Sequence, residues 1–557
     1  MGEERLNREQ QPQSTIIANH HNQQSIFDII MNQKISKALL VLLSVGWSFL
    51  SCQPNDPDEP YMRNHDMQKP QYTIMFYTIG GGDLDLAIED NLMEAMRMMY
   101  TSDVSVRFFV QMKYSNEQTY WKKQMEKNPK LNKNEYRPRG GDFSTVYRYE
   151  LLPSLLTKNG KDMQKLPASA KYGNQGDKAA FYNPDSIASF INYCKAQNPT
   201  ADKYIFILSD HGGGYSPLND FDKSVSSTPS PIGPRRAVCF DPQLEGNSIT
   251  MLELKEGILK SNVQKFDLMF FDCCLLNIVD VICEMPGVAD YTLASGHSTS
   301  GCDYGNLLKQ LYLSLGGYQS KLDAFKRYTQ NCADVHKERY KNGSTDVRDY
   351  YIDWALTQTD QLPAMMSAMK TFTDAVCNYY DKETLSAAEL LAKYQKAANY
   401  PWHYCDIYPY YDLVGYAYAL AQVINTPEVT QAYNTLHSTV SNAIIYHSYA
   451  NNAENNNLSY SINVGAKGYL RYDFKKDHTT FACFDKDGNV GFYNPNTGEI
   501  AADPSNENAS PKFAWKYSFD QTAFEKATGW TRWMEKNPSM PHNNPPDDDI
   551  YDTNGLR

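Results

Sequence analysis

The sequence lacks any run of basic residues. Among its 557 residues, Lys and Arg number 53 against 65 Asp and Glu, which gives a formal net charge of -12. Proteins that bind nucleic acid neutralise the phosphate backbone with clustered Lys and Arg side chains. Nucleic acid is therefore excluded as a main partner.

Long apolar runs are also missing. The mostly apolar segment Ala38–Leu50 has thirteen residues, which is too short to span a bilayer comfortably. Lys34 and Lys37 precede it, so it has the charged and apolar parts of a secretory signal. Ser51 and Cys52 follow, and a small residue before Cys at this place resembles a bacterial lipobox, in which the Cys is lipidated. An ordinary signal peptide followed by an incidental Cys is the alternative.

These N-terminal features predict an exported protein. Residues 1–30 are polar and carry no targeting pattern, so Met31 is the expected start, with a signal peptide at 31–51. An acidic, Pro-rich tether at 52–70 would follow the lipidated Cys52. We expect a protein held by this lipid at the outer membrane of a Gram-negative-type bacterium, and the acidic residues after Cys52 favour the outer surface.

CxxC pairs and zinc-type spacings are absent among the eleven Cys residues. Ten of them follow Cys52 at irregular intervals. A disulfide framework is typical of small secreted domains, and this chain is large enough to fold without one. Cys194, Cys239 and Cys283 lie in apolar contexts, where buried free thiols are the usual explanation.

What the first half does contain is a regular alternation of short apolar runs with helical patterns. Strands are predicted at Tyr72–Tyr77, Val104–Met112, Tyr204–Leu208, Leu268–Phe271 and Tyr291–Ala294, and helices at 84–96, Ser186–Cys194, Thr250–Leu259 and Leu275–Met285. This alternation predicts an α/β fold with a mostly parallel sheet and helices on both faces. In such sheets, ligands bind outside the carboxyl ends of the strands.

The same patterns divide the chain into parts. A core at 71–305 carries two long insertions, 113–178 and 216–236, the second rich in Ser and Pro. From 306 to 535 the pattern is largely helical with a small β element, and 536–557 has the composition of a disordered tail.

Two strand ends carry reactive residues. His211 and Gly212 come just after the strand Tyr204–Leu208, and Cys274 comes just after Leu268–Phe271. If these strands are parallel neighbours, His211 and Cys274 share one edge of the sheet. A thiolate is a strong nucleophile at neutral pH, and an imidazole can carry the proton that acyl transfer requires.

The neighbouring residues favour this chemistry. Gly212 allows the backbone to approach a substrate carbonyl and to offer its N–H to a developing oxyanion. A helix beginning near Leu275 would direct its N-terminus at Cys274 and favour the thiolate. Purely structural roles are the alternative, since a strand-end His and the pair Cys273-Cys274 are both compatible with simple packing.

Several segments of the chain resemble one known family of peptidases. YIFILSDHGGGY resembles the His-Gly motif of the clostripain-like cysteine peptidases, and FDLMFFDCCLLNIVDV resembles their Asp-Ala-Cys motif. The resemblance extends from about Gln71 to about Glu535, through segments such as YTIMFYTIGGGDLDLAIEDNLMEAM and YSFDQTAFEKATGWTRWME. It implies the caspase-like fold of the caspase and gingipain clan, with a mostly parallel sheet flanked by helices, a largely helical C-terminal part and a small β element.

Carried over by motif, the resemblance implies that Cys274 is the nucleophile and His211 its catalytic partner. Cys273 stands where the family usually has Ala, and it is not expected to be the nucleophile. The backbone N–H groups of Gly212 and Cys274 would form the oxyanion hole. The implied reaction is hydrolysis of a peptide bond through an acyl-thioester, by a dyad that requires no third residue.

The resemblance also implies a substrate preference. Clostripain-like enzymes prefer a basic residue before the scissile bond, which requires an acid in the specificity pocket. Asp303 is the expected acid, with Asp272 as a secondary contributor and Ser295 as part of the wall. Capping of a loop is the alternative for Asp303. His297, in the same loop, is expected to be exposed and incidental, with a part in shaping the pocket as the alternative.

Family members are often made as zymogens that cut themselves in a loop after the His. The segment 216–236 occupies that place, and self-cleavage is expected after Arg235 or Arg236, with Lys223 as a lesser candidate. Some relatives need calcium, so calcium is left open as a cofactor. The candidate ligands, which lack EF-hand spacing, are Asp220, Asp222 and Asp241.

Two other functions compete with a cysteine endopeptidase acting on proteins or peptides. The first is a metal hydrolase, whose activity would respond to chelators and not to thiol alkylation. Its site would consist of Asp210, His211, Asp241 and His297. The second is a surface lipoprotein that has lost activity and binds protein or glycan. The presence of both His211 and Cys274 favours the endopeptidase.

Overall fold

The structure is a computed structural model that describes parts of the chain from residue 66 onward. The described residues are 66–114, 117–127, 129, 143, 145–160, 162–174, 181–212, 238–241, 247–297, 299, 301–344, 352–382, 410–449, 462–465, 481–484, 490–494, 499–502 and 522–536. The predicted signal peptide, Cys52, Arg235, Arg236 and the tail after 536 lie outside these ranges. Within them, no helix is both long and apolar enough to cross a membrane.

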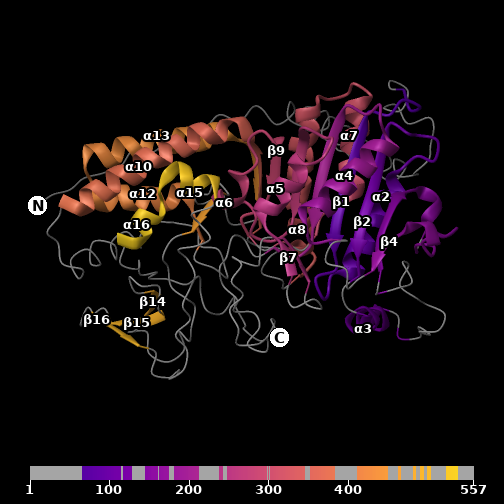
Figure 1. The fold of residues 1–557 in the computed structure, drawn as a ribbon, viewed down its shortest axis with the longest axis horizontal. Helices are drawn as coiled ribbons and strands as arrows, with labels where there is room; N and C mark the ends of the chain where they lie inside the picture. Colours follow the sequence, from indigo (N-terminus) through magenta and orange to yellow (C-terminus); the bar gives the residue numbers. More distant parts are fainter. Residues whose placement is uncertain are drawn as a thin grey trace, which may run out of the picture. The chain divides into compact units, whose positions relative to one another are not determined.

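A nine-stranded sheet forms the centre of the fold, in the order β12-β10-β9-β8-β5-β1-β2-β3-β4 (Figure 1). Its strands are β1 (Tyr72–Ile79), β2 (Val106–Lys113), β3 (Thr145–Leu151), β4 (Lys171–Asn174), β5 (Lys203–Ser209), β8 (Phe266–Asp272), β9 (Ala289–Ala294), β10 (Asp353–Gln358) and β12 (Ile444–Tyr449). The central strands β9, β8, β5, β1 and β2 run parallel, and antiparallel pairs extend both edges. The predicted α/β class with a mostly parallel sheet is confirmed.

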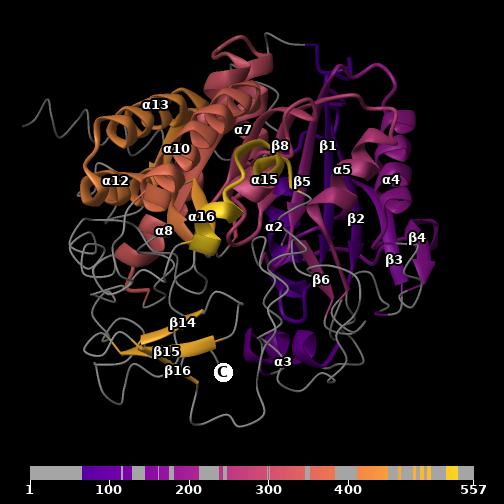
Figure 2. The same ribbon diagram turned by 60° about the vertical axis from the view of Figure 1, so that its left-hand side comes forward.

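Helices cover both faces of the sheet because the central strands are apolar on both sides. In β1, Tyr72, Ile74 and Phe76 belong to one apolar cluster, and Met75 and Tyr77 belong to another. The first face carries α2 (Asp85–Met98), α7 (Tyr304–Leu315) and α8 (Lys321–Lys341), and the second carries α4 (Pro184–Gln197) and α5 (Met251–Leu259). Figure 2 shows α4 and α7 on opposite sides of the strands.

Two of the predicted helices begin where the sequence supplies caps. In α4, Pro184 follows Asn183, whose side chain accepts a hydrogen bond from the backbone N–H of Ser186. Thr250 and Glu253 form a capping box at the start of α5. These helix predictions are confirmed, with small shifts at the ends.

The segment 113–178 contributes strands to the main sheet. β3 pairs with β2, and β4 pairs with β3, so both extend one edge. Helix α3 (Glu117–Lys127) lies beside α2. Glu89 of α2 is buried and accepts hydrogen bonds from the hydroxyls of Tyr114 and Tyr120, at 2.7 and 2.9 Å. The Tyr120 bond fastens α3 to α2, and the Tyr114 bond fastens the residue after β2 to the same carboxylate.

The chain after α8 returns to the main sheet twice, through β10 before the first helices of a helical cluster and through β12 after α13. The cluster comprises α10 (Leu362–Lys382), α12 (Leu413–Ile424), α13 (Pro427–Ala443), α15 (Ala523–Thr528) and α16 (Thr531–Lys536), packed with α6 (Val279–Ile282). Smaller sheets are formed by β6 (Val238–Asp241) with β7 (Asn247–Ile249), by β11 (Tyr410–Asp412) with β13 (Asn463–Gly465), and by β14 (Phe481–Phe484), β15 (Val490–Asn494) and β16 (Glu499–Ala502). Short 3₁₀ helices are η2 (Pro153–Leu155), η3 (Ala168–Ala170) and η5 (Thr359–Gln361).

One predicted helix is wrong. The pattern of Leu275–Met285 predicts a helix directly after Cys274, whereas the helix found there, α6, covers only Val279–Ile282. Leu275 has a φ of 60°, which lies in the left-handed region and interrupts a right-handed helix. A helix N-terminus therefore does not lie at Cys274, and its predicted support for a thiolate is withdrawn.

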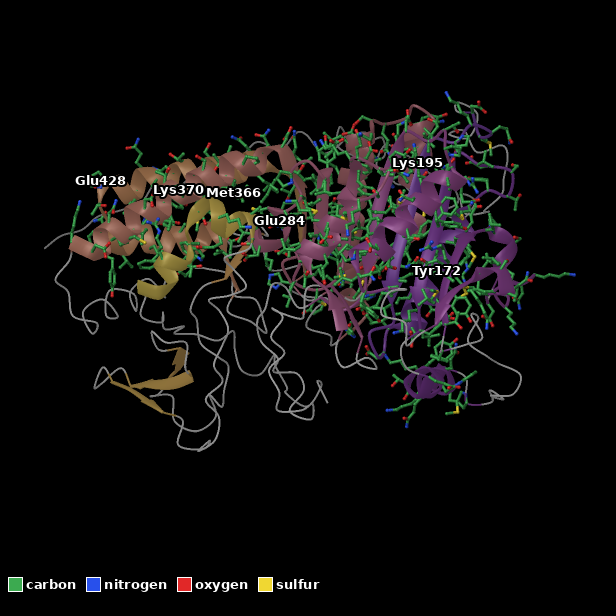
Figure 3. The ribbon with its side chains drawn as sticks, viewed as in Figure 1. Tyr172, Lys195, Glu284, Met366, Lys370 and Glu428 are labelled. Atoms are coloured by element: carbon green, nitrogen blue, oxygen red, sulfur yellow. The ribbon has the colours of Figure 1, made fainter. Side chains whose placement is uncertain are left out.

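Two buried carboxyl groups connect α6 and the residues just after it to the C-terminal helices. Asp280 accepts a hydrogen bond from the hydroxyl of Thr522 at 3.2 Å. Glu284, labelled in Figure 3, accepts one from the backbone N–H of Ala523 at 2.5 Å. Burial raises the pKa of Asp280 to about 7, and the nearby Glu525 and Glu284 carboxylates add to the rise.

Replacing Asp280 by Asn is therefore expected to stabilise the protein at neutral pH and not at acidic pH. The unfolded chain ionises this carboxyl near 3.8 and the folded chain near 7, so the wild type loses stability across this interval as pH rises. Above it, the gain in the Asn variant should be on the order of 4 kcal/mol. Thermal unfolding between about pH 4 and pH 8 measures this gain. The matched control is Asp185→Asn, at an exposed carboxylate. A gain that does not vary with pH would contradict the prediction.

Candidate active site

The carboxyl ends of three neighbouring strands meet at one edge of the sheet. β5 pairs with β8 in a register that aligns Ser209 with Asp272, and it pairs with β1 on its other side. β2 and β5 lie on opposite sides of β1, so the strand order reverses here and forms a topological switch point. His211 and Cys274 each lie two residues beyond the aligned pair.

The backbone of Gly212 lies directly against that of Cys274. A Cβ added to Gly212 would be 2.0 Å from the backbone O of Cys274 and 2.9 Å from its N. Only a residue without a side chain fits at such a close approach. The two residues predicted to form the oxyanion hole are therefore neighbours in space.

The thiol of Cys274 is half-buried and lies against the backbone of Thr299. The N–H of Thr299 donates to Sγ at 3.2 Å, and Sγ lies 3.7 Å from the O of Thr299. Hydrogen bonds donated to sulfur favour the thiolate, which is the nucleophilic form. Sequence reasoning missed Thr299, because this contact joins two loops that are 25 residues apart.

The turn after Cys274 is held by backbone hydrogen bonds from the following loops. Leu275, in its left-handed conformation, donates its N–H to the O of His297 at 3.0 Å. The next two N–H groups donate to the O of Ser295. A left-handed residue other than glycine costs roughly 1–2 kcal/mol, and these bonds hold it in place. The sharp turn places Cys274 at the end of β8.

The two adjacent cysteines differ in environment. Cys273 is fully buried, its thiol lies 3.5 Å from the O of Leu208, and burial raises its pKa well above the ordinary value. A buried neutral thiol is a poor nucleophile. Cys274 retains partial exposure. The difference supports Cys274, and not Cys273, as the nucleophile.

A residue that sequence reasoning missed contacts His211. Asp83, in the loop after β1, places its Oδ1 2.8 Å from Nε2 of His211. Lys123 of α3 donates to Oδ2 of the same carboxylate at 3.1 Å and to the backbone O of Asp83 at 2.8 Å. The hydrogen bond from His211 is the main cause that lowers the pKa of Asp83 to about 2. The sequence signal that could have identified Asp83 is its position just after β1, which is a neighbour of β5.

Gly81 brings the loop after β1 against the same histidine. Its φ is 53°, and an added Cβ would lie 2.6 Å from Cδ2 of His211 and 2.1 Å from Oδ1 of Asp210. A side chain here would suffer both the left-handed backbone and the clash. Glycine thus allows Asp83 to come within reach of His211.

The three residues predicted to bind substrate make internal contacts. Asp272 is buried, accepts hydrogen bonds from the hydroxyls of Ser209, at 3.1 Å, and Tyr304, and has its pKa raised by burial. Ser295 is fully buried, with its hydroxyl 3.3 Å from the O of His297. Asp303 is partly exposed and forms the N-cap of α7. Its capping role was the alternative interpretation.

His297 is buried, and the expectation that it is exposed is wrong. Its side chain is 4% exposed, because the loop after β9 folds inward against β10, where Nε2 lies 3.8 Å from Oδ2 of Asp353. The Asp353 carboxylate also accepts the N–H of Gly296 at 3.2 Å. Asp353, which sequence reasoning did not single out, thereby fastens the loop whose carbonyl groups hold the turn at Leu275.

Within the described residues, no three His, Cys, Asp or Glu side chains are grouped so as to hold a metal ion. Asp220, Asp222 and the side chain of Asp241 lie outside the described part. Neither calcium binding nor the metal-hydrolase alternative therefore gains support from the described residues.

The α/β fold, with a Cys and a His just beyond two neighbouring parallel strands, is the arrangement expected of an α/β cysteine peptidase. The model of the Clostripain family matches residues 152–536, which is more than half of the chain, so the protein belongs to the clostripain family. Clostripain of Hathewaya histolytica is 24% identical over 276 residues, which cover 45% of each protein. The chain thus spans about 45% of the length of that curated relative. The family resemblance seen in the sequence is confirmed.

Two of the solved structures that are similar to this chain come from Bacteroides and Parabacteroides. A secreted C11 cysteine protease from Bacteroides thetaiotaomicron, in complex with an irreversible peptide inhibitor, is 15% identical with a TM-score of 0.47, covering 83% of this chain and 99% of that one. An inactive zymogen C11 protease from Parabacteroides distasonis is 14% identical with a TM-score of 0.44, covering 83% and 98%.

Proposed function

We propose that the protein is an endopeptidase in which Cys274 attacks the peptide carbonyl and His211 carries the proton. One observation carries the proposal: Gly212, next to His211, lies backbone to backbone against Cys274. Residues on the two strand ends are thus close enough to act on one carbonyl group. Membership of the clostripain family supports the same reaction class.

In the acylation step, the Sγ of Cys274 loses its proton to His211 and forms a bond to the carbonyl carbon. The carbonyl oxygen becomes an oxyanion, which the N–H groups of Gly212 and Cys274 stabilise. The C–N bond then breaks, and the imidazolium of His211 gives its proton to the departing amine. The products are a free amine and an acyl-thioester on Cys274.

In the deacylation step, His211 takes a proton from water, and the hydroxide attacks the thioester carbonyl. The C–S bond breaks, the acid product leaves, and the proton on His211 returns to Cys274. The N–H of Thr299, 3.2 Å from Sγ, is placed to stabilise the departing thiolate. The cycle consumes one water and needs no other co-reactant.

The proposed preference is for Arg or Lys before the scissile bond, with Asp303 as the acidic partner. Asp272 and Ser295 are buried, whereas Asp303 is partly exposed in the loop between β9 and α7. Its Oδ1 accepts the N–H of Asn306 at 3.0 Å. A carboxylate has further acceptor positions, so capping and substrate binding are compatible.

Asp303→Asn tests this preference, because Asn caps a helix about as well as Asp and removes only the charge. A hydrogen bond to a charged group contributes about 1.5–3 kcal/mol, so kcat/KM for Arg peptides should fall roughly tenfold to a hundredfold. Fluorogenic peptides with Arg, Lys, Asp or Ala before the scissile bond measure it, and the Ala peptide is the control. If kcat/KM falls equally for the Arg and Ala peptides, Asp303 acts only as a helix cap and does not bind the basic side chain. If the wild type cleaves none of these peptides, the alternative function, an inactive lipoprotein that binds protein or glycan, would be favoured.

Self-cleavage after Arg235 or Arg236 is part of the proposed function. The last described residue before this loop is Gly212, and the first described residues after it form β6. β6 lies beside β1 and β5. Both ends of the loop are thus anchored near Cys274. New termini near Arg236 in the wild type, absent from Cys274→Ala, are the measurable result.

Export and lipid anchoring at Cys52 are also proposed, from the apolar segment and the small residue before Cys52. Metabolic labelling with a fatty acid tests this in a Gram-negative host. Label should appear on the wild type in the membrane fraction and disappear in Cys52→Ala. Labelling of neither protein would favour the ordinary signal peptide.

A further inference from the structure

The loop after β1 places a carboxylate against the histidine of the proposed dyad. Asp83 Oδ1 lies 2.8 Å from Nε2 of His211, and Lys123 of α3 holds the other oxygen of Asp83 at 3.1 Å. Gly81 lets this loop approach, because any side chain there would meet His211 and Asp210. The contact therefore depends on two separate parts of the chain, the β1 loop and α3.

The charges fix the direction of the hydrogen bond. The contact with His211 lowers the pKa of Asp83 to about 2, so its carboxylate is ionised at any pH near neutrality and can only accept. Nε2 of His211 must then carry the proton that points to Asp83. In the neutral imidazole, Nδ1 is left as the nitrogen with the free lone pair.

We propose that Asp83 is a positioning residue that holds His211 in the Nε2–H form, so that Nδ1 exchanges the proton with Cys274. The inference rests on the proposed roles of His211 and Cys274. The Asp83 carboxylate also stabilises the imidazolium that forms when the thiol proton is taken up. Lys123 keeps the carboxylate in place, which links α3 and the segment 113–178 to the reaction.

Other charged groups near the pair do not replace Asp83. Lys123 carries the opposite charge and faces Asp83 from α3. Asp210, which precedes His211, is buried beneath Gly81, whereas the side chains of Asp83 and His211 are 48% and 43% exposed. Solvent screens a half-exposed pair, so its effect should be well below that of a fully buried one.

The test compares purified wild type, Asp83→Asn, Asp83→Ala and a control, Asp185→Asn, whose carboxylate is exposed on α4. The first readout is the rate of Cys274 alkylation by iodoacetamide against pH, located by mass spectrometry. Without the carboxylate, the imidazolium is less stable and the thiolate forms at higher pH. The midpoint should rise by roughly half to one pH unit in both Asp83 variants and stay unchanged in the control.

The second readout is peptide turnover, in which kcat of Asp83→Ala should fall roughly tenfold to a hundredfold with little change in KM. Asp83→Asn, which has the same shape, should fall less, because its Oδ1 can still accept from Nε2–H. An alkylation profile and a kcat that both match the wild type would overturn the proposal. His211→Ala distinguishes failure of the dyad from failure of the positioning role. If His211→Ala keeps full activity, the proposed dyad is wrong. If His211→Ala is inactive while Asp83→Ala has normal activity, only the positioning role of Asp83 is wrong.

Discussion

Cys274→Ala is expected to abolish both peptide hydrolysis and self-cleavage, with kcat/KM falling by at least about 10⁴. The substitution removes the only atom proposed to bond to the substrate carbonyl, so no acyl-thioester can form. Thermal unfolding should change little, because the thiol is a small group that is only partly buried. Fluorogenic turnover and mass spectrometry of the chain termini measure the two activities.

The adjacent cysteine provides the matched control. Cys273→Ala removes the same atoms one residue earlier, from a fully buried site where the thiol contacts the O of Leu208. We expect a loss of stability of about 1 kcal/mol and turnover close to wild type. If Cys273→Ala were the inactive variant and Cys274→Ala retained turnover, the assignment of the nucleophile would be reversed.

Gly212→Ala is expected to lower kcat roughly a hundredfold to a thousandfold, which is the usual effect of losing an oxyanion-hole donor. The added Cβ would lie 2.0 Å from the backbone O of Cys274 and 2.9 Å from its N. Backbone atoms cannot move aside as a flexible side chain can, so one of the two strand ends must shift. Either shift displaces the N–H groups proposed to bind the oxyanion.

A second glycine separates this effect from a general loss of stability. Gly160 has a φ of 65°, and an added Cβ there would meet nothing within 4 Å. Gly160→Ala should therefore cost roughly 1–2 kcal/mol through backbone strain alone and leave kcat unchanged. Steady-state kinetics and thermal unfolding of both variants distinguish the cases. A Gly212→Ala protein with normal kcat would show that Gly212 takes no part in the oxyanion hole.

Local patterns in the sequence predicted much of the fold. The strands β1, β5, β8 and β9 follow apolar runs that are buried on both faces, and Asn183 and Thr250 mark the starts of α4 and α5 through bonds to residues three positions away. Signals of this kind depend on neighbouring residues and can be read from a single chain. The helix predicted at Leu275–Met285 failed because tertiary hydrogen bonds to Ser295 and His297 stabilise a left-handed turn that local propensity opposes.

Contiguous motifs in the sequence were enough to predict the family, the fold class and the positions of His211 and Cys274 just beyond two strands. Tertiary structure decided which residues surround them. Asp83 reaches His211 across 128 positions, and Thr299 reaches Cys274 across 25. Contacts of this kind arise only when the parallel strands bring their carboxyl ends together, because sheet order is set by packing over the whole chain. The same packing made Ser295 and His297 part of the interior, although their loop is polar in sequence.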